Sequence, residues 1–234
     1  MSSELQALIH LQEYDSKIAG LEAEANRLPK RIEAIHASIA EARGTVEVVK
    51  VKVETTRKNL RTKEKDLEVV AARRSKADAH LWEVKTNKEY SAVLVEIEDI
   101  KQQKAHAEEE ILALMETQER LAAEIGDAET RLKTREEQGR QDEAVVRQQL
   151  AAVEAELTGV RGERATLARE VPVGLLADYE RILKARAGLA IVPVPTTAVC
   201  GGCRVTIRPQ AIQELRNGEL TRCESCGRYL YWHE

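Results

Sequence analysis

The sequence contains no phenylalanine, and its aromatic residues are limited to two tryptophans and five tyrosines in 234 residues. A large globular core usually relies on aromatic side chains, because each buries more apolar area than an aliphatic one. Their scarcity beside abundant Ala, Leu, Glu, Lys and Arg is typical of long, narrow contacts between helices. We therefore expect a mainly α protein whose core is thin.

Long apolar runs are also missing. No apolar stretch follows Met1, and nowhere do about 18 apolar residues run together as a membrane span requires. The net charge is only −4 despite 36 basic and 40 acidic residues, so the overall charge does not point to nucleic acid or to a membrane. We expect a soluble, unsecreted protein of the cytoplasm, with no membrane insertion.

No catalytic arrangement is recognisable. The five histidines are scattered along the chain, and no glycine-rich phosphate-binding loop is present. The sequence therefore predicts that the protein is not an enzyme and has no small-molecule substrate.

The sequence is rich in apolar residues spaced alternately three and four apart. One run extends from Leu11 to Val84; a second begins at Tyr90 and, after a polar stretch around Gly139, resumes displaced by one residue as far as Leu167. This 3.5-residue repeat is the pattern of a coiled coil. Pro29 predicts a kink near Leu28, because proline removes a helix hydrogen bond and clashes with the preceding turn.

Two features predict that the coiled coil folds back on itself as an antiparallel hairpin. Thr86 followed by Glu89 is the signature of a new helix start, which places the tip near residues 85–90. Residues 50–76 are mainly basic and residues 97–123 mainly acidic, and these ranges face each other in such a hairpin. The basic run is thus explained by pairing within the chain, with RNA or DNA contact as the alternative. The hairpin is predicted to occupy residues 1–171.

Residues 172–234 are predicted to form a short helix and a small zinc ribbon. Apolar spacing predicts a helix over residues 175–183, and a second short helix is expected over 209–216. Residues 189–194 are predicted to form an edge strand, and residues 228–232 a closing strand. Two Cys-x-x-Cys pairs separated by 19 residues have the spacing of a site for one tetrahedral Zn²⁺. Because four sulfurs would leave no coordination position for water, this zinc is expected to be structural. A redox pair or free thiols are the alternatives. The predicted ligands are Cys200, Cys203, Cys223 and Cys226.

Two surfaces are candidates for partner contacts. Trp82, Asn87 and Tyr90 lie at the predicted tip, where Trp82 either anchors a protein partner or only caps the apolar contact. The ribbon offers aromatic residues near the C-terminus, which either complete its core or stack on bases. Its candidate nucleic-acid contacts are Arg204, Arg208, Arg222 and Arg228.

The chain resembles the bacterial coiled-coil proteins that carry a C-terminal C4-type zinc ribbon, a family described as predicted nucleic-acid-binding. The resemblance spans nearly the whole chain and is most specific at Thr86–Ala92, Leu176–Arg181 and Cys200–Leu230; Arg208, where relatives often have an apolar residue or a second proline, departs from it. It implies a kinked hairpin, zinc on the four cysteines, and a binding function. Relatives engage the sigma-54 type factor, flagellar or type III secretion components and, in one lineage, a flagellin message.

Two hypotheses follow from the sequence. The first is a non-enzymatic, zinc-binding adaptor that binds proteins, such as a sigma factor or a secretion component, through the tip and the ribbon. The second is an RNA- or DNA-binding regulator that uses the ribbon arginines. The heptads could also pair between chains, although the two matched arms and their opposite charges favour pairing within one chain.

Overall fold

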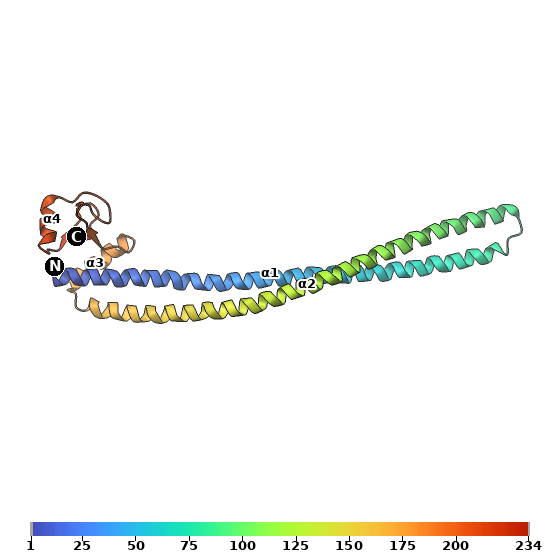
Figure 1. Ribbon diagram of the computed structural model, residues 1–234. Helices are drawn as coiled ribbons and strands as arrows, with labels where there is room; N and C mark the ends of the chain where they lie inside the picture. Colours follow the sequence, from blue (N-terminus) through green and yellow to red (C-terminus); the bar gives the residue numbers. More distant parts are fainter. Residues whose placement is uncertain (1, 234) are drawn as a thin grey trace. The chain divides into compact units, whose positions relative to one another are not determined.

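The computed structural model describes residues 2–233 and confirms a helical hairpin followed by a small ribbon (Figure 1). Two long helices, α1 and α2, run side by side in opposite directions. The chain divides into two compact units, one made of residues up to Glu33 and from Glu143 on, the other of Ala34–Asp142. The elements are α1 (Ser3–Leu81), α2 (Asn87–Ala168), α3 (Val173–Ala185), β1 (Ile191–Val194), α4 (Pro209–Arg216), β2 (Thr221–Arg222) and β3 (Tyr229–Trp232).

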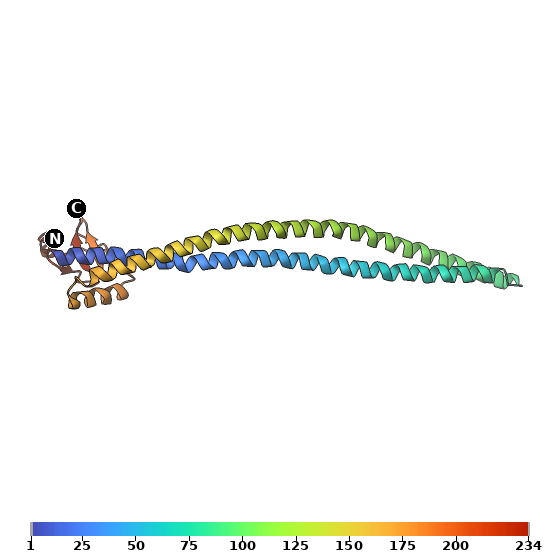
Figure 2. The same cartoon turned by 90° about the horizontal axis from the view of Figure 1, so that it is seen from below.

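In the unit Ala34–Asp142, α1 and α2 lie side by side (Figure 2). The predicted apolar positions, which we call the seam, face the partner helix and are shielded from solvent. Every predicted seam position of this unit is buried or half-buried except Tyr90, which the sequence pattern wrongly placed in the seam and which is 47% exposed. Val93 is therefore the first buried seam residue of α2. Lys63 occupies a seam position and pairs with Glu110 across the hairpin at 2.8 Å, as the opposite charges of the two ranges predict.

Gly139 lies in the polar stretch that interrupts the seam pattern, and it allows a close approach of the two helices. A Cβ at this position would lie 2.7 Å from Ile39 Cδ1 and 3.1 Å from Ile35 Cγ2. Gly139 is buried. Because α2 has no side chain at this position, Ile35 and Ile39 of α1 can approach its backbone, and the seam continues through the polar stretch.

The turn between α1 and α2 has the reciprocal hydrogen bonds of a capping box. Glu89 N–H donates to Thr86 Oγ1 at 3.3 Å, and Thr86 N–H donates to Glu89 Oε2 at 3.2 Å. These bonds satisfy donors that a helix start otherwise leaves free. They also hold the pKa of Glu89 below its usual value.

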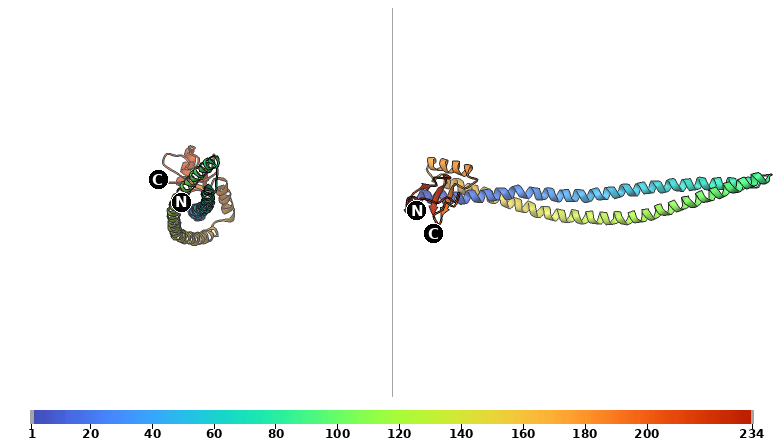
Figure 3. Two further views of the ribbon diagram at one scale, coloured as in Figure 1. Left: turned by 90° about the vertical axis from the view of Figure 1, so that its right-hand side faces the viewer. Right: turned by 90° about the horizontal axis from the view of Figure 1, so that it is seen from above.

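The other unit joins the N-terminal end of α1, the C-terminal end of α2, α3 and the ribbon (Figure 3). Leu5, Leu8 and Leu11 of α1 are almost fully buried against α3 and the first strand. Leu5 and Leu8 precede the predicted seam, so the N-terminal end of α1 forms part of the core beneath the ribbon. In this unit α1 continues through Pro29 without a break, while the kink near Leu28 stays a prediction.

The ribbon is a three-stranded sheet of order β1-β3-β2 with α4 packed beside it. β1 pairs in parallel with β3, and β2 pairs antiparallel with β3. The predicted edge strand, closing strand and helix are confirmed, whereas the two-residue β2 was not predicted. Within residues 2–233 no helix combines the length and apolar content that crossing a membrane requires.

Candidate metal centre and hairpin tip

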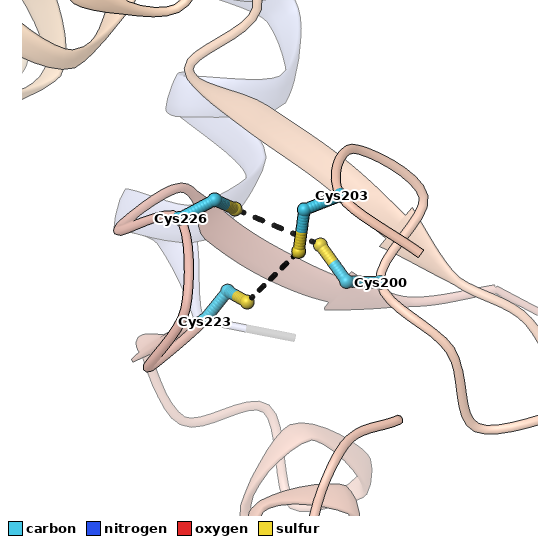
Figure 4. A group of neighbouring side chains, drawn as sticks. All are labelled: Cys200, Cys203, Cys223 and Cys226. Atoms are coloured by element: carbon cyan, nitrogen blue, oxygen red, sulfur yellow. Dashed lines mark hydrogen bonds between the residues drawn. The ribbon is translucent and has the colours of Figure 1, made fainter. Parts of the chain in front are cut away.

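The four cysteines converge on one point in the ribbon (Figure 4). Their sulfur atoms all lie within 4.8 Å of one another, and Cys200, Cys223 and Cys226 are buried. The Sγ–Sγ distances are 3.9 Å for Cys200–Cys226 and 3.6 Å for Cys203–Cys223, and none of the four forms a disulfide. A tetrahedron with Zn–S bonds of 2.3 Å has edges of about 3.8 Å. The donor set therefore fits a zinc ion.

The two Cys-x-x-Cys segments, here called knuckles, share one backbone pattern. In the first, Cys200 N–H donates to the Val205 carbonyl at 2.9 Å, and Arg204 N–H donates to the Cys200 carbonyl at 2.9 Å. In the second, Cys223 N–H donates to the Arg228 carbonyl and Gly227 N–H to the Cys223 carbonyl, at 2.9 and 2.8 Å. Each cysteine pair is thus presented by the same turn.

The residue after each second cysteine has a positive φ. That residue is Gly227 in the second knuckle, with φ of 76°, and Arg204 in the first, with φ of 59°. Glycine adopts this conformation without steric cost, whereas arginine does not. Arg204 is therefore held in a backbone conformation set by the knuckle, and its side chain is exposed.

Gly201 permits the first knuckle to approach β1. Its N–H donates to the Pro193 carbonyl at 2.9 Å, and a Cβ on Gly201 would lie 2.6 Å from that carbonyl oxygen. Because the clash would be with backbone, any larger residue must displace the strand or the knuckle. The glycine thus fixes the metal centre against the edge of the sheet.

Burial and hydrogen bonding shift the thiol pKa values in opposite directions. Burial raises the pKa of Cys200, and it raises that of Cys223 to about 12. A hydrogen bond from the backbone N–H of Val205 is the main cause that lowers the pKa of Cys203 to about 6. A bound cation compensates the burial of thiolates, which is why buried sulfur clusters of this kind suit zinc.

Three of the four arginines proposed for nucleic-acid contact are engaged inside the chain. Arg222 donates to Tyr229 Oη at 2.7 Å, pairs with Asp178 of α3, and stacks over the Tyr229 ring. Arg228 donates to the carbonyls of Leu189 and Arg186 at 2.8 and 3.1 Å. Arg208 pairs with Glu224 at 3.1 Å. These contacts connect parts of the ribbon to each other and to α3.

The ribbon aromatics mostly belong to its core. Tyr229 is buried, and its hydroxyl donates to Asp178 at 2.7 Å. Tyr231 and Trp232 are half-buried, and the Arg216 guanidinium lies 4.5 Å from the centre of the Trp232 ring. The structure thus favours the core interpretation of these aromatics over base stacking.

The predicted tip residues are exposed around the turn. Trp82 directly follows α1 and is 89% exposed, while Asn87 and Tyr90 lie in the first turn of α2. A tryptophan exposed to this extent does not cap the seam, so that alternative for Trp82 is not supported.

A polar network beneath the ribbon was not predicted. Gln12 of α1 is buried; its side-chain oxygen accepts from Ala190 N–H at 2.6 Å, and its amide donates to the Gly188 carbonyl at 2.7 Å. Asp15, one helical turn further, accepts from the Tyr179 hydroxyl and from Arg164. These residues hold α1, α2, α3 and the start of β1 together, and no local sequence signal marks them.

The comparisons with known proteins agree with this geometry. Residues 11–187 match the model of the CT398-like coiled coil hairpin domain, and residues 199–230 match that of the C4-type zinc ribbon domain. The chain belongs to the CT398-like coiled-coil hairpin family. Its C4 ribbon, with four clustered cysteines, supports one structural zinc ion. When bound, zinc crosslinks the two knuckles; because four sulfurs complete its coordination, it has no open catalytic position.

Three solved structures show the same fold. CT398 from Chlamydia trachomatis is 23% identical, covers 98% of both chains and superposes with a TM-score of 0.83. A protein from Mycobacterium smegmatis (21% identity, 99% of this chain and 98% of that one, TM-score 0.73) and the HP0958 protein from Helicobacter pylori (19%, 99% and 98%, 0.64) are also similar. No curated protein matches the sequence.

Proposed function

We propose that this chain is a cytoplasmic, non-enzymatic adaptor that binds a protein of the transcription or secretion machinery through the hairpin tip, with the zinc ribbon as a second contact surface. The observation that carries the proposal is Trp82, a tryptophan 89% exposed beside a well-defined turn. Tryptophan is the residue type most enriched at binding hot spots, because it buries a large area on contact.

The turn presents this side chain on a rigid support. The capping box between Thr86 and Glu89 fixes the start of α2, and Tyr90 follows one residue later on the same turn. A contact surface that is ordered before binding loses less conformational entropy on association. The tip therefore has both an aromatic anchor and a fixed geometry.

The ribbon arginines favour a protein partner over nucleic acid. Phosphate contacts need basic side chains that are free to reach the backbone of RNA or DNA. Arg222 and Arg228 instead hold the ribbon to α3 and to the segment before β1. Arg204 remains as an exposed arginine at the metal centre, which gives the ribbon a small contact surface and leaves nucleic-acid binding as the alternative.

Histidine placement supports a role without catalysis. His10, His80 and His106 lie on exposed helix faces beside Glu13, Glu83 and Glu110 of their own segments. General acid or base catalysis needs such a group within hydrogen-bond reach of a bound substrate. These positions on open helix surfaces do not provide that enclosure.

The test is affinity purification of the tagged full-length protein from its native cells, with and without ribonuclease. The variants are wild type, Trp82→Ala/Tyr90→Ala, and Val173→Ala as a control that removes an apolar side chain 85% exposed on α3. We expect specific proteins to survive ribonuclease, to be lost with the tip variant and to be kept with the control.

Two results would contradict this proposal. If the tip variant retains every protein partner, the tip is not the binding surface. If the partners disappear with ribonuclease and one transcript is enriched, the RNA-binding alternative replaces the adaptor.

A further inference from the structure

The face of α1 opposite the seam has a second pattern with three-and-four spacing. It begins at Val48 and Val51 and continues two residues after each seam position, about 200° around the helix. Every position of this spacing from 48 to 79 is Val, Thr, Ala or Lys, with no acidic residue. We call this face the basic stripe, after Lys58, Lys65 and Lys76.

Apolar side chains of the basic stripe are unusually exposed. Val48, Val51 and Val69 are 57, 65 and 59% exposed. Within the described residues 2–233, Lys58, Lys65 and Lys76 have no ion-pair partner, unlike Lys63 in the seam. An amphipathic helix with a second apolar and charged stripe is typical of a helix that contacts two neighbours.

The outward face of α2 carries the opposite charge. Val95 and Leu112 are 62 and 60% exposed there, and the positions at three-and-four spacing from 91 to 123 hold no basic residue. We call this face the acidic stripe, after Glu98, Glu109 and Glu116. Within residues 2–233, Glu109 and Glu116 have no ion-pair partner, and Glu98 is paired only with Lys101 of its own helix.

The charges of the two stripes lie at similar levels along the hairpin. Gly139, which lies between Ile35 and Ile39, and the Arg73–Gln103 hydrogen bond show which residues of α1 and α2 are level with each other. Counting from these contacts, Lys58, Lys65 and Lys76 are each within about two residues, or 3 Å of helical rise, of the level of an acidic residue. The acidic residues near the levels of Lys58, Lys65 and Lys76 are Glu116, Glu109 and Glu98, respectively.

From this correspondence we propose that the hairpin binds a second copy of this chain, with the basic stripe of one copy against the acidic stripe of the next. Two hairpins placed side by side with their tips level bring all three lysines opposite the three glutamates at once. The exposed valines then face small residues, Val69 opposite Ala105 and Val51 opposite Ala123. Flanking charges of this kind select partner and register in helical assemblies.

This contact is heterologous, because the two copies use different faces. After the first contact one copy keeps a free acidic stripe and the other a free basic stripe, so the assembly does not close as a two-fold dimer. Association therefore continues beyond the dimer as the protein concentration rises. Since the ion pairs are exposed to solvent, the contact weakens as salt increases.

Sedimentation velocity of the purified full-length protein tests this proposal at about 50 mM and about 500 mM salt. We expect a sedimentation coefficient that increases with protein concentration at low salt and a marked reduction at high salt. Two variants reverse one stripe each, Lys58→Glu/Lys65→Glu/Lys76→Glu and Glu98→Lys/Glu109→Lys/Glu116→Lys. Each alone should associate about tenfold more weakly than wild type, and an equimolar mixture should associate again, because opposite stripes are then restored.

The matched control for the lysine variant is Lys30→Glu/Lys52→Glu/Lys133→Glu, which makes the same change in net charge as that variant but outside both stripes. It should associate like wild type, and circular dichroism should show equal helix content in all variants. A wild-type protein that stays monomeric at low salt would overturn the proposal and leave the basic stripe to an acidic helix of another protein. A mixture that fails to associate while both variants are folded would overturn it equally.

Discussion

The hydroxyl of Tyr179 in α3 donates a 2.8 Å hydrogen bond to the carboxylate of Asp15 in α1. Tyr179 is fully buried, and burial together with the Asp15 charge raises the pKa of its hydroxyl. Arg164 of α2 binds the same carboxylate at 3.1 Å. One acidic side chain thus connects three helices beneath the ribbon.

Removal of Asp15 should destabilise this unit more than removal of the Tyr179 hydroxyl. Asp15→Ala leaves a buried hydroxyl and a largely buried guanidinium without their shared partner, so we expect a loss of about 2–3 kcal/mol in the free energy of unfolding. Tyr179→Phe leaves the Asp15–Arg164 pair intact and should cost about 1 kcal/mol. Fluorescence of Trp232 in a Trp82→Phe background reports this unit alone during denaturant unfolding. Asp142→Ala, an exposed change, should have no measurable effect.

Gln12 should be the second sensitive position. Gln12→Leu preserves the size of the side chain but leaves the Ala190 N–H and the Gly188 carbonyl without their partners, so about 2–4 kcal/mol of stability should be lost. Gln12→Glu keeps the acceptor for Ala190 but replaces the donor to Gly188, and it should be intermediate near neutral pH. The same Trp232 measurement checks both variants. Equal stability of Gln12→Leu and wild type would show that Gln12 does not hold the start of β1.

Two glycines of α2 should respond differently to alanine. At Gly126 a Cβ meets nothing within 4 Å, so Gly126→Ala should stabilise the hairpin by about 0.5–1 kcal/mol through helix propensity. At Gly139 the gain in helix propensity is offset by a clash, because a new Cβ would lie 2.7 Å from Ile39 Cδ1 and the Ile39 side chain must rotate away. We expect Gly139→Ala to lie close to wild type and Gly139→Leu well below it. Thermal unfolding followed by circular dichroism measures the order.

Alkaline pH should weaken the ribbon through Tyr229. Burial, aided by the hydrogen bond to Asp178, raises the pKa of Tyr229 to about 12 from the value near 10 of an unfolded chain. A raised pKa means that the stabilisation is complete below pH 10 and is lost as the pH rises from 10 towards 12. The contribution lost at pH 11 is about 1 kcal/mol. Unfolding at pH 9 and pH 11 should therefore show a larger difference for wild type than for Tyr229→Phe, and equal differences would contradict the assignment.

The features that local patterns determine were predicted from the sequence. The seam follows from heptad spacing, the helix α4 from Pro209 and Asn217-Gly218, and the start of α2 from Thr86 and Glu89. The knuckle spacing likewise indicated the zinc ligands, because Cys-x-x-Cys turns direct two sulfurs to one point.

The contacts that hold the helices together beneath the ribbon were not predicted. Gln12 and Ala190 are 178 positions apart, and Asp15 and Arg164 are 149 apart, so only the packed structure brings them together. No sequence pattern indicated that Arg222 and Arg228 have partners within the chain. Arg222 pairs with the distant Asp178, and Arg228 donates to backbone carbonyls, which no residue type marks. Leu5 and Leu8 were not predicted either, because the predicted seam began at Leu11 and their partners lie in α3 and near β1.

The most direct test of the metal centre is zinc content combined with hydrogen exchange before and after chelation. We expect one zinc per chain, and removal of zinc should raise amide exchange throughout residues 190–232, where the sheet depends on both knuckles. Exchange in residues 34–142 should stay unchanged, because the seam does not involve the metal. Metal-free protein with an equally protected ribbon would contradict the account.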